Sequence, residues 1–93
     1  MFILSFCMSV IFHRIKEGEF IRLVEARGID DLFIQESQLT PDKYHLLGIN
    51  TQTKIGYVVR HGRTDTMREW RLDILAALIK RLGFTRFNVK MNP

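Results

Sequence analysis

The stretch that decides the fold class is DILAALIKRL, residues 73–82, with Gly83 and the run TRFNVKM at 85–91 behind it. In 73–82 the apolar residues recur at the spacing of one helix face, and Gly83 suits the left-handed residue that closes many helices. Polar and apolar residues then alternate through 85–91, as in a strand with one buried face. The sequence therefore predicts a helix over 73–82 and then a strand over 85–91. The strand face expected to meet the helix consists of Phe87, Val89 and Met91.

Upstream of this unit, residues 32–71 predict an antiparallel β-meander. The run IGYVVRH at 55–61 is rich in β-branched and aromatic residues, which favours a central strand. A turn-forming stretch follows, and 67–71 is expected to return as a further strand. Pro41 also allows a short helix over 41–47, because proline is favoured in the first turn of a helix, but we prefer strands for this region.

Nearer the N-terminus, residues 13–28 predict a helix. Their apolar residues lie toward one face, acidic residues come early and basic residues late, and Gly28 is a suitable stop. The 93 residues suffice for one small domain. We therefore expect a single α+β domain over 1–93: a small antiparallel meander, the C-terminal helix packed on it, and the N-terminal helix beside it.

Residues 1–12, MFILSFCMSVIF, form an apolar run. As a helix the run would be about 18 Å long, too short for the roughly 30 Å core of a bilayer, so we expect no membrane partner. Because an exposed patch of this size would be sticky, we expect the fold or a second subunit to cover it, unless translation starts at Met8. The residues that would form an oligomer contact are Phe2, Ile3, Leu4, Phe6, Val10 and Ile11.

Several residue types that often carry chemistry lack the pattern it needs. The one cysteine, Cys7, cannot form an internal disulfide, which predicts a cytoplasmic protein, and its apolar surroundings predict a buried, unreactive thiol. His13, His45 and His61 lack the spacing of metal ligands, and no glycine-rich phosphate loop is present. We therefore expect no metal, no cofactor and no catalytic residue.

The charge of the chain is distributed unevenly. The total is +4, but residues 1–47 carry −2 and residues 48–93 carry +6. Clustered basic charge favours an anionic partner, and a sheet face with cations and an aromatic ring can hold a phosphate backbone and stack a base. Trp70 is expected in the core. The candidate residues for nucleic-acid binding are Tyr57, Arg60, Arg63, Arg68, Arg86 and Lys90.

Arg60-His61-Gly62, with the valines before it and Arg63-Thr64 after it, resembles the signature of the histidine phosphatase and phosphoglycerate mutase family. The resemblance implies that Arg60 would clamp a phosphoryl group and that His61 would attack it. It covers residues 58–64 alone. The family also needs a second histidine, a second arginine and an acid further along the chain, and no histidine follows His61 here.

The stretch 55–91 is similar to a module of small plasmid-borne accessory proteins, some of them partition-associated. The shared pattern is a strand, an Arg-Gly turn, an aromatic strand, a Leu-Asp helix, Leu-Gly and then Phe-x-Val. The turn departs from it by its Gly-Arg order. The matching residues are Gly62-Arg63, Glu69-Trp70, Leu72-Asp73, Leu82-Gly83 and Phe87-Asn88-Val89.

Taken alone, the sequence favours a non-enzymatic binding protein with an adaptor or accessory role, which binds a protein partner or a second copy of itself. The alternative is a nucleic-acid-binding accessory protein that uses the basic C-terminal half. A more distant alternative is phosphate-ester chemistry at Arg60-His61-Gly62.

Overall fold

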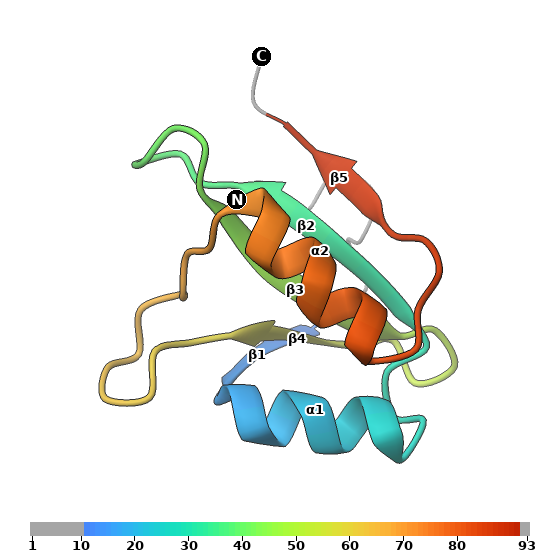
Figure 1. Cartoon of the computed structure of the whole chain (residues 1–93). Coiled ribbons are helices and arrows are strands. Elements are labelled where there is room, and N and C mark those ends of the chain that lie inside the picture. Colours follow the sequence, from blue (N-terminus) through green and yellow to red (C-terminus); the bar gives the residue numbers. More distant parts are fainter. Residues whose placement is uncertain (1–10, 92–93) are drawn as a thin grey trace.

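The computed structural model describes residues 11–91, which form a mixed sheet and two helices (Figure 1). The elements in chain order are β1 (Ile11–Ile15), α1 (Glu17–Glu25), β2 (Asp31–Glu36), β3 (Tyr44–Asn50), β4 (Ile55–Val59), α2 (Leu72–Arg81) and β5 (Asn88–Lys90). The predicted α+β class is confirmed, with one helix early in the chain and one late. Because β3 is a strand from Tyr44, the alternative of a short helix over 41–47 is wrong.

The sheet is mixed, and the expectation of a purely antiparallel meander is wrong. The strand order is β1-β4-β3-β2-β5. β2, β3 and β4 are antiparallel neighbours, as predicted, but β1 pairs in parallel with β4 and β5 pairs in parallel with β2. A hairpin reverses the chain, whereas parallel neighbours need a longer crossover connection. The alternation of residues in a strand carries no information about its direction, so the sequence of 85–91 did not predict the parallel pairing of β5 with β2.

The helix predicted over 13–28 is wrong at both ends. β1 runs to Ile15, and α1 begins only at Glu17. β1 forms because it pairs with β4 along its length, and this tertiary pairing outweighs the helical spacing of its apolar residues. The left-handed residue that ends α1 is Arg27, with φ 61°, and not Gly28.

The return strand expected over 67–71 is also wrong. The segment makes two isolated bridges, Met67 with Arg60 and Trp70 with Tyr44. Arg60 follows β4 and Tyr44 begins β3, so the segment crosses from one strand to the next and does not lie along either. Trp70 is buried in the core, as predicted.

α2 confirms the predicted C-terminal helix, and Gly83 behind it has the predicted left-handed conformation, with φ 93°. β5 is shorter than the strand predicted over 85–91. Phe87 packs against the core as expected, but Val89 and Met91 are 41% and 66% exposed and do not form a buried face. β5 is the edge strand, and no element of the described chain lies beyond it.

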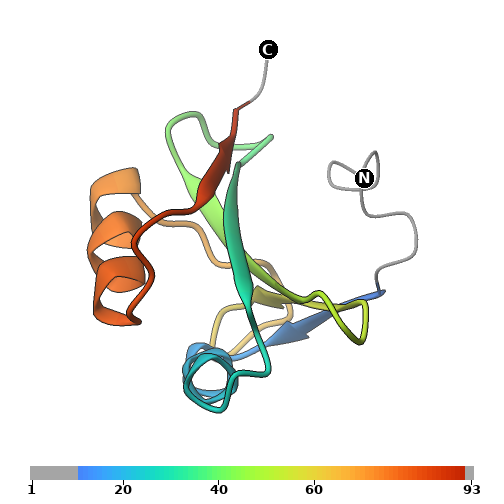
Figure 2. The same ribbon diagram turned by 90° about the vertical axis from the view of Figure 1, so that its right-hand side faces the viewer.

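Both helices pack on one face of the sheet, which we call the helix-covered face (Figure 2). Phe20 of α1 and Leu75 of α2 belong to one continuous buried cluster, which also takes in side chains of β2, β3 and β4. Neither helix of the described chain is long and apolar enough to cross a membrane. The cluster consists of Phe20, Val24, Ile29, Leu32, Ile34, Tyr44, Leu46, Val59, Trp70, Leu75, Leu78 and Ile79.

The opposite face, which we call the helix-free face, carries a second buried cluster. Its members are Phe33, Leu47, Ile49 and Val58. The central strand β3 therefore has buried side chains on both faces. A strand with one solvated face alternates apolar and polar residues, whereas the sequence of β3, YHLLGIN, is mostly apolar on both faces.

Candidate binding face

The register of the strands brings a row of side chains across the helix-free face. Arg14 of β1 lies beside Val58 of β4, Val58 lies beside Leu47 of β3, and Leu47 lies beside Phe33 of β2. His45 lies two residues before Leu47 and so shares its face. The middle of the face is therefore apolar, and polar side chains gather toward the end where β3 begins.

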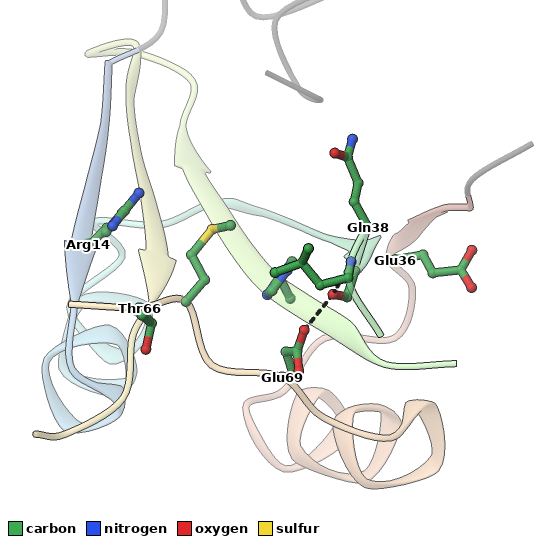
Figure 3. A pocket seen from close by; sticks show the side chains of 9 residues that line it. Arg14, Glu36, Gln38, Thr66 and Glu69 are labelled. Atoms are coloured by element: carbon green, nitrogen blue, oxygen red, sulfur yellow. Dashed lines mark hydrogen bonds between the residues drawn. The ribbon is translucent and has the colours of Figure 1, made fainter. Parts of the chain in front are cut away.

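A pocket of about 430 Å³ lies at this polar end, between the loop after β2 and the segment after β4 (Figure 3). Its walls combine the apolar side chains of Leu39 and Met67 with carboxylates, hydroxyls and one guanidinium. The lining residues are Arg14, Glu36, Ser37, Gln38, Leu39, His45, Thr66, Met67 and Glu69.

Ser37 holds the two walls of the pocket together. Its hydroxyl donates a hydrogen bond to the Glu69 carboxylate, which is the dashed line at Glu69 in Figure 3. Its oxygen also accepts the backbone N–H groups of Leu39 and Thr40, both at 3.2 Å. Ser37 is buried. These three hydrogen bonds tie the loop after β2 to itself and to the segment that carries Glu69.

His45, which also lines the pocket, holds the segment over 67–70 in place. Its Nδ1 lies 3.0 Å from the backbone oxygen of Arg68. A carbonyl oxygen can only accept, so Nδ1 carries the proton and donates. The buried imidazole thereby anchors the residues between the two isolated bridges of this segment.

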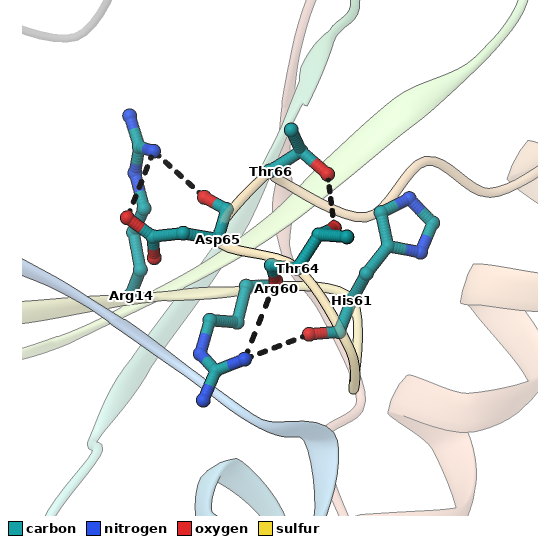
Figure 4. A network of polar contacts seen from close by, with 6 residues as sticks. All are labelled: Arg14, Arg60, His61, Thr64, Asp65 and Thr66. Carbon is teal, nitrogen blue, oxygen red and sulfur yellow. Dashed lines mark hydrogen bonds and ion pairs between the residues drawn. The ribbon is translucent and has the colours of Figure 1, made fainter.

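Arg14 closes the side of the pocket near β1. Its Nη1 donates to the Asp65 backbone oxygen at 2.7 Å and lies 3.5 Å from the Asp65 carboxylate (Figure 4). Both side chains are half exposed or more, so this ion pair is worth at most about 1 kcal/mol. Its role is to hold the loop over 60–66 against β1.

The motif that resembles the histidine phosphatases is arranged differently from what the resemblance implies. Arg60 Nη1 donates to the backbone oxygens of His61 at 2.9 Å and Thr64 at 3.3 Å, so it stabilises its own loop. His61 is exposed, and its ring points away from the Arg60 guanidinium (Figure 4). The two side chains are not directed at a common site.

The six residues predicted to bind nucleic acid are spread over the molecule. Tyr57 lies on the helix-covered face, where it packs against the core, whereas Lys90 has the register of the helix-free face, beside Gln35. Arg68 forms an ion pair with Glu17 and stacks over Trp70 at 4.6 Å from the ring centroid.

The remaining three predicted cations also lie on different parts of the fold. Arg60 and Arg63 belong to the loop after β4, and Arg86 precedes β5. Since β3 and β2 separate β4 from β5, these residues are not neighbours on one strand pair. The predicted residues thus form no single basic patch.

Most of the predicted oligomer contacts lie outside the described residues. These are Phe2, Ile3, Leu4, Phe6 and Val10, and Cys7 lies there too. Ile11 is the one member within the described part; it begins the edge strand β1 and is 65% exposed.

Sequence reasoning missed the residues that build the pocket. Ser37 and Leu39 lie just before Thr40-Pro41, and a serine placed before such a turn often bonds the backbone two or three residues on. That signal could have located the loop, but it says nothing about Glu69, which lies 32 residues further along the chain.

No family model, no curated protein and no solved structure matches this chain. The similarities to histidine phosphatases and to plasmid-borne accessory proteins therefore remain predictions. Within residues 11–91, no three His, Cys, Asp or Glu side chains are grouped so as to hold a metal ion.

Proposed function

We propose that this chain is a non-enzymatic protein-binding module, and that it binds its partner at the rim of the pocket on the helix-free face. The observation that carries the proposal is Leu39. This leucine is 92% exposed at the pocket rim, although large apolar side chains are usually buried. Leu39 lines the pocket together with Met67, so two apolar side chains lie together beside loops, and loops held by a rigid scaffold commonly carry binding residues.

The loop that carries Leu39 is fixed before any partner arrives. The hydrogen bond from the Leu39 N–H to Ser37 holds the backbone of the leucine itself, and the Ser37–Glu69 bond holds the loop to the opposite wall. A preorganised loop loses less conformational entropy on binding, which raises affinity. Leu39 is thus positioned as an anchor for a complementary apolar site.

The charges around the rim indicate the chemistry of the partner. Glu36 and Glu69 line the pocket, and the one cation, Arg14, is already paired with Asp65. The rim is therefore acidic overall. We infer a partner surface that offers an apolar cavity for Leu39 and a lysine or arginine beside it, because opposite charges at the rim steer association. A cytoplasmic location fits the single cysteine.

The proposal is tested first with a second copy of the chain and then with other proteins. Sedimentation across a concentration series measures self-association. In parallel, Gln38 is replaced by a photo-crosslinking amino acid, and a protein that crosslinks in cells is purified and titrated. Leu39→Ser is expected to weaken the binding at least about tenfold, as for an interface hot spot.

The matched control is Ile74→Ser, which removes an apolar side chain that is 50% exposed and lies on α2, away from the pocket. It is expected to leave the dissociation constant unchanged within about twofold. If the two variants weaken binding equally, or if neither does, the proposed site is wrong.

Nucleic acid is the competing partner, and it is tested with the same protein. Labelled DNA and RNA are titrated by fluorescence anisotropy across a salt series. We expect no binding that falls steeply with salt, because the predicted cations form no single patch. Sub-micromolar binding with a log-log salt slope of several units would overturn the protein-binding proposal.

A further inference from the structure

The strand β5 forms one edge of the sheet. It pairs in parallel with β2 through Asn88–Lys90, and no other strand of residues 11–91 pairs with it (Figure 1). An edge strand presents backbone N–H and C=O groups on its outer side, and such an edge can accept a strand from another chain. β5 is therefore a position at which a further strand can extend the sheet.

Two exposed apolar side chains lie along this edge. Val89 of β5 is 41% exposed, and Met91, directly after the strand, is 66% exposed. Val89 pairs with Ile34, which belongs to the buried cluster of the helix-covered face. Phe87, two residues before Val89, shares this face and packs against the cluster. A strand added beside β5 would cover the exposed apolar side chains as well as pair with the backbone.

A pocket of about 330 Å³ adjoins the start of β5 on the helix-covered face. α2 forms one wall, and the connection from α2 to β5 forms the other. Because the three residues of β5 offer few backbone hydrogen bonds, an added strand also needs side-chain contacts, and a pocket beside the edge supplies them. The lining residues are Ala76, Ile79, Lys80, Phe84, Thr85 and Phe87.

The charges around β5 indicate which kind of strand fits. Residues 80–91 contain four basic side chains and no acidic one. Lys80, Arg81 and Arg86 are exposed, and none of them forms an ion pair within residues 11–91. Asp31 lines a small pocket together with Arg86, but the two side chains are not within ion-pair distance. The surroundings of the edge are therefore positively charged.

We propose that β5 binds an extended acidic segment of another protein, which adds to the sheet as a further strand. Backbone hydrogen bonds join the segment to β5, its carboxylates meet the cations of residues 80–91, and an apolar side chain enters the pocket beside Phe87. This inference uses none of the residues that line the pocket beside Leu39, so it does not rest on the proposed function.

An acidic polypeptide fits this edge better than a second copy or a nucleic acid does. Two β5 strands paired with each other would bring the cations of both copies together, and like charges across a strand pair are destabilising. A nucleic acid would neutralise the cations, but phosphate contacts make no use of a strand edge or of the exposed Val89 and Met91.

The probe is a short synthetic peptide in which glutamate and valine alternate, titrated against the full chain by fluorescence anisotropy. We expect saturable binding that weakens as the salt concentration rises, because salt screens charge pairs at the surface. The same peptide with N-methyl groups on its central residues keeps its side chains and its charge but loses backbone donors. It is expected to bind at least about tenfold more weakly, since backbone hydrogen bonds hold an added strand.

A charge reversal on the chain tests the position of the site. Lys80→Glu combined with Arg86→Glu is expected to weaken binding of the acidic peptide at least about tenfold. The matched control, Lys54→Glu with Arg63→Glu, makes the same change in net charge in the loops before and after β4, which β3 and β2 separate from β5. It is expected to leave the dissociation constant within about twofold, because salt screens distant charges.

Leu39→Ser separates this inference from the proposed function. It alters the rim of the other pocket and is expected to leave binding of the acidic peptide within about twofold. If Leu39→Ser weakens this binding as much as the double variant at Lys80 and Arg86 does, the acidic peptide does not bind at β5 and the inference is wrong.

Four further outcomes would overturn the inference. The first is that the acidic peptide shows no saturable binding up to about 1 mM. The second is that the N-methylated peptide binds as tightly as the unmodified one. The third is that the control double variant weakens binding as much as the variant at Lys80 and Arg86. The fourth is that single-stranded DNA of equal charge binds more tightly than the peptide, since the cations would then hold a phosphate backbone.

Discussion

Leu46 and Leu47 are neighbours in β3, and both are 0% exposed, but they are buried in different ways. Leu46 lies in the large cluster beneath α1 and α2. Leu47 lies in the small cluster on the face without a helix. The comparison shows that this sheet has two apolar faces, one packed beneath both helices and one that neither helix covers.

The largest expected effect is on the free energy of unfolding when each leucine is cut back. We expect Leu46→Ala and Leu47→Ala each to lower it by about 2–5 kcal/mol, because each leaves a cavity in a packed layer. The two values are expected to agree within about 1 kcal/mol, measured by urea denaturation.

A large difference between the two variants would break the comparison. If Leu47→Ala costs less than about 1 kcal/mol while Leu46→Ala costs the full amount, the helix-free face is not a packed layer. The control is the m-value, which scales with the surface exposed on unfolding and should be the same in both variants as in the unchanged protein.

Two glycines sharpen the same comparison, because one lies on each face. A Cβ added to Gly48 would come within 2.7 Å of Ile29 and 3.0 Å of Phe20, both fully buried on the helix-covered face. A Cβ added to Gly56 would meet the ring of Phe12, which is only partly buried on the edge strand β1.

Gly48→Ala is therefore expected to cost about 1–3 kcal/mol, as for overpacking of a closed core, and Gly56→Ala is expected to cost less, since the Phe12 ring can turn aside. Thermal unfolding of the two variants measures the difference. The reverse order would mean that the Phe12 ring is held more tightly than the buried side chains around Gly48.

The sequence predicts the elements better than it predicts their arrangement. α2, Gly83 and the central strands follow from local periodicity and from turn residues, and these are confirmed. Residues 13–15 of β1 were predicted as the start of a helix, because β4, the partner of β1, lies more than 40 residues further along the chain. Parallel pairing of edge strands leaves no local signal.

The candidate site could not be predicted from the sequence for the same reason. Ser37 lies in a stretch that looks like an ordinary polar loop and Glu69 in one predicted as a strand, and only the fold brings them together. The cations that drew attention in the sequence are instead used locally: Arg60 bonds its own loop, and Arg68 pairs with Glu17. Charge that stands out in a sequence does not by itself define a surface.

The smallest expected effects concern the contacts of Arg68 and Glu69, which are neighbours in the segment after β4. Arg68 contacts α1 on the helix-covered face, and Glu69 contacts the loop after β2 on the helix-free face. Glu69 accepts a bond from the buried Ser37, and Arg68 pairs with Glu17, where both side chains are more than a third exposed. A hydrogen bond to a charged group is worth about 1.5–3 kcal/mol, whereas an exposed ion pair is worth under about 1 kcal/mol.

Ser37→Ala is therefore expected to lower the free energy of unfolding by about 1.5 kcal/mol or more at any salt concentration. Glu17→Gln is expected to cost about 0.5 kcal/mol, and most of that cost disappears at 1 M salt, because screening removes the attraction that the variant lacks. Urea denaturation at low and high salt measures both. A Glu17→Gln cost that persists at high salt would mean that this pair is shielded from solvent, and the helix-covered side would then hold the segment as firmly as the pocket side does.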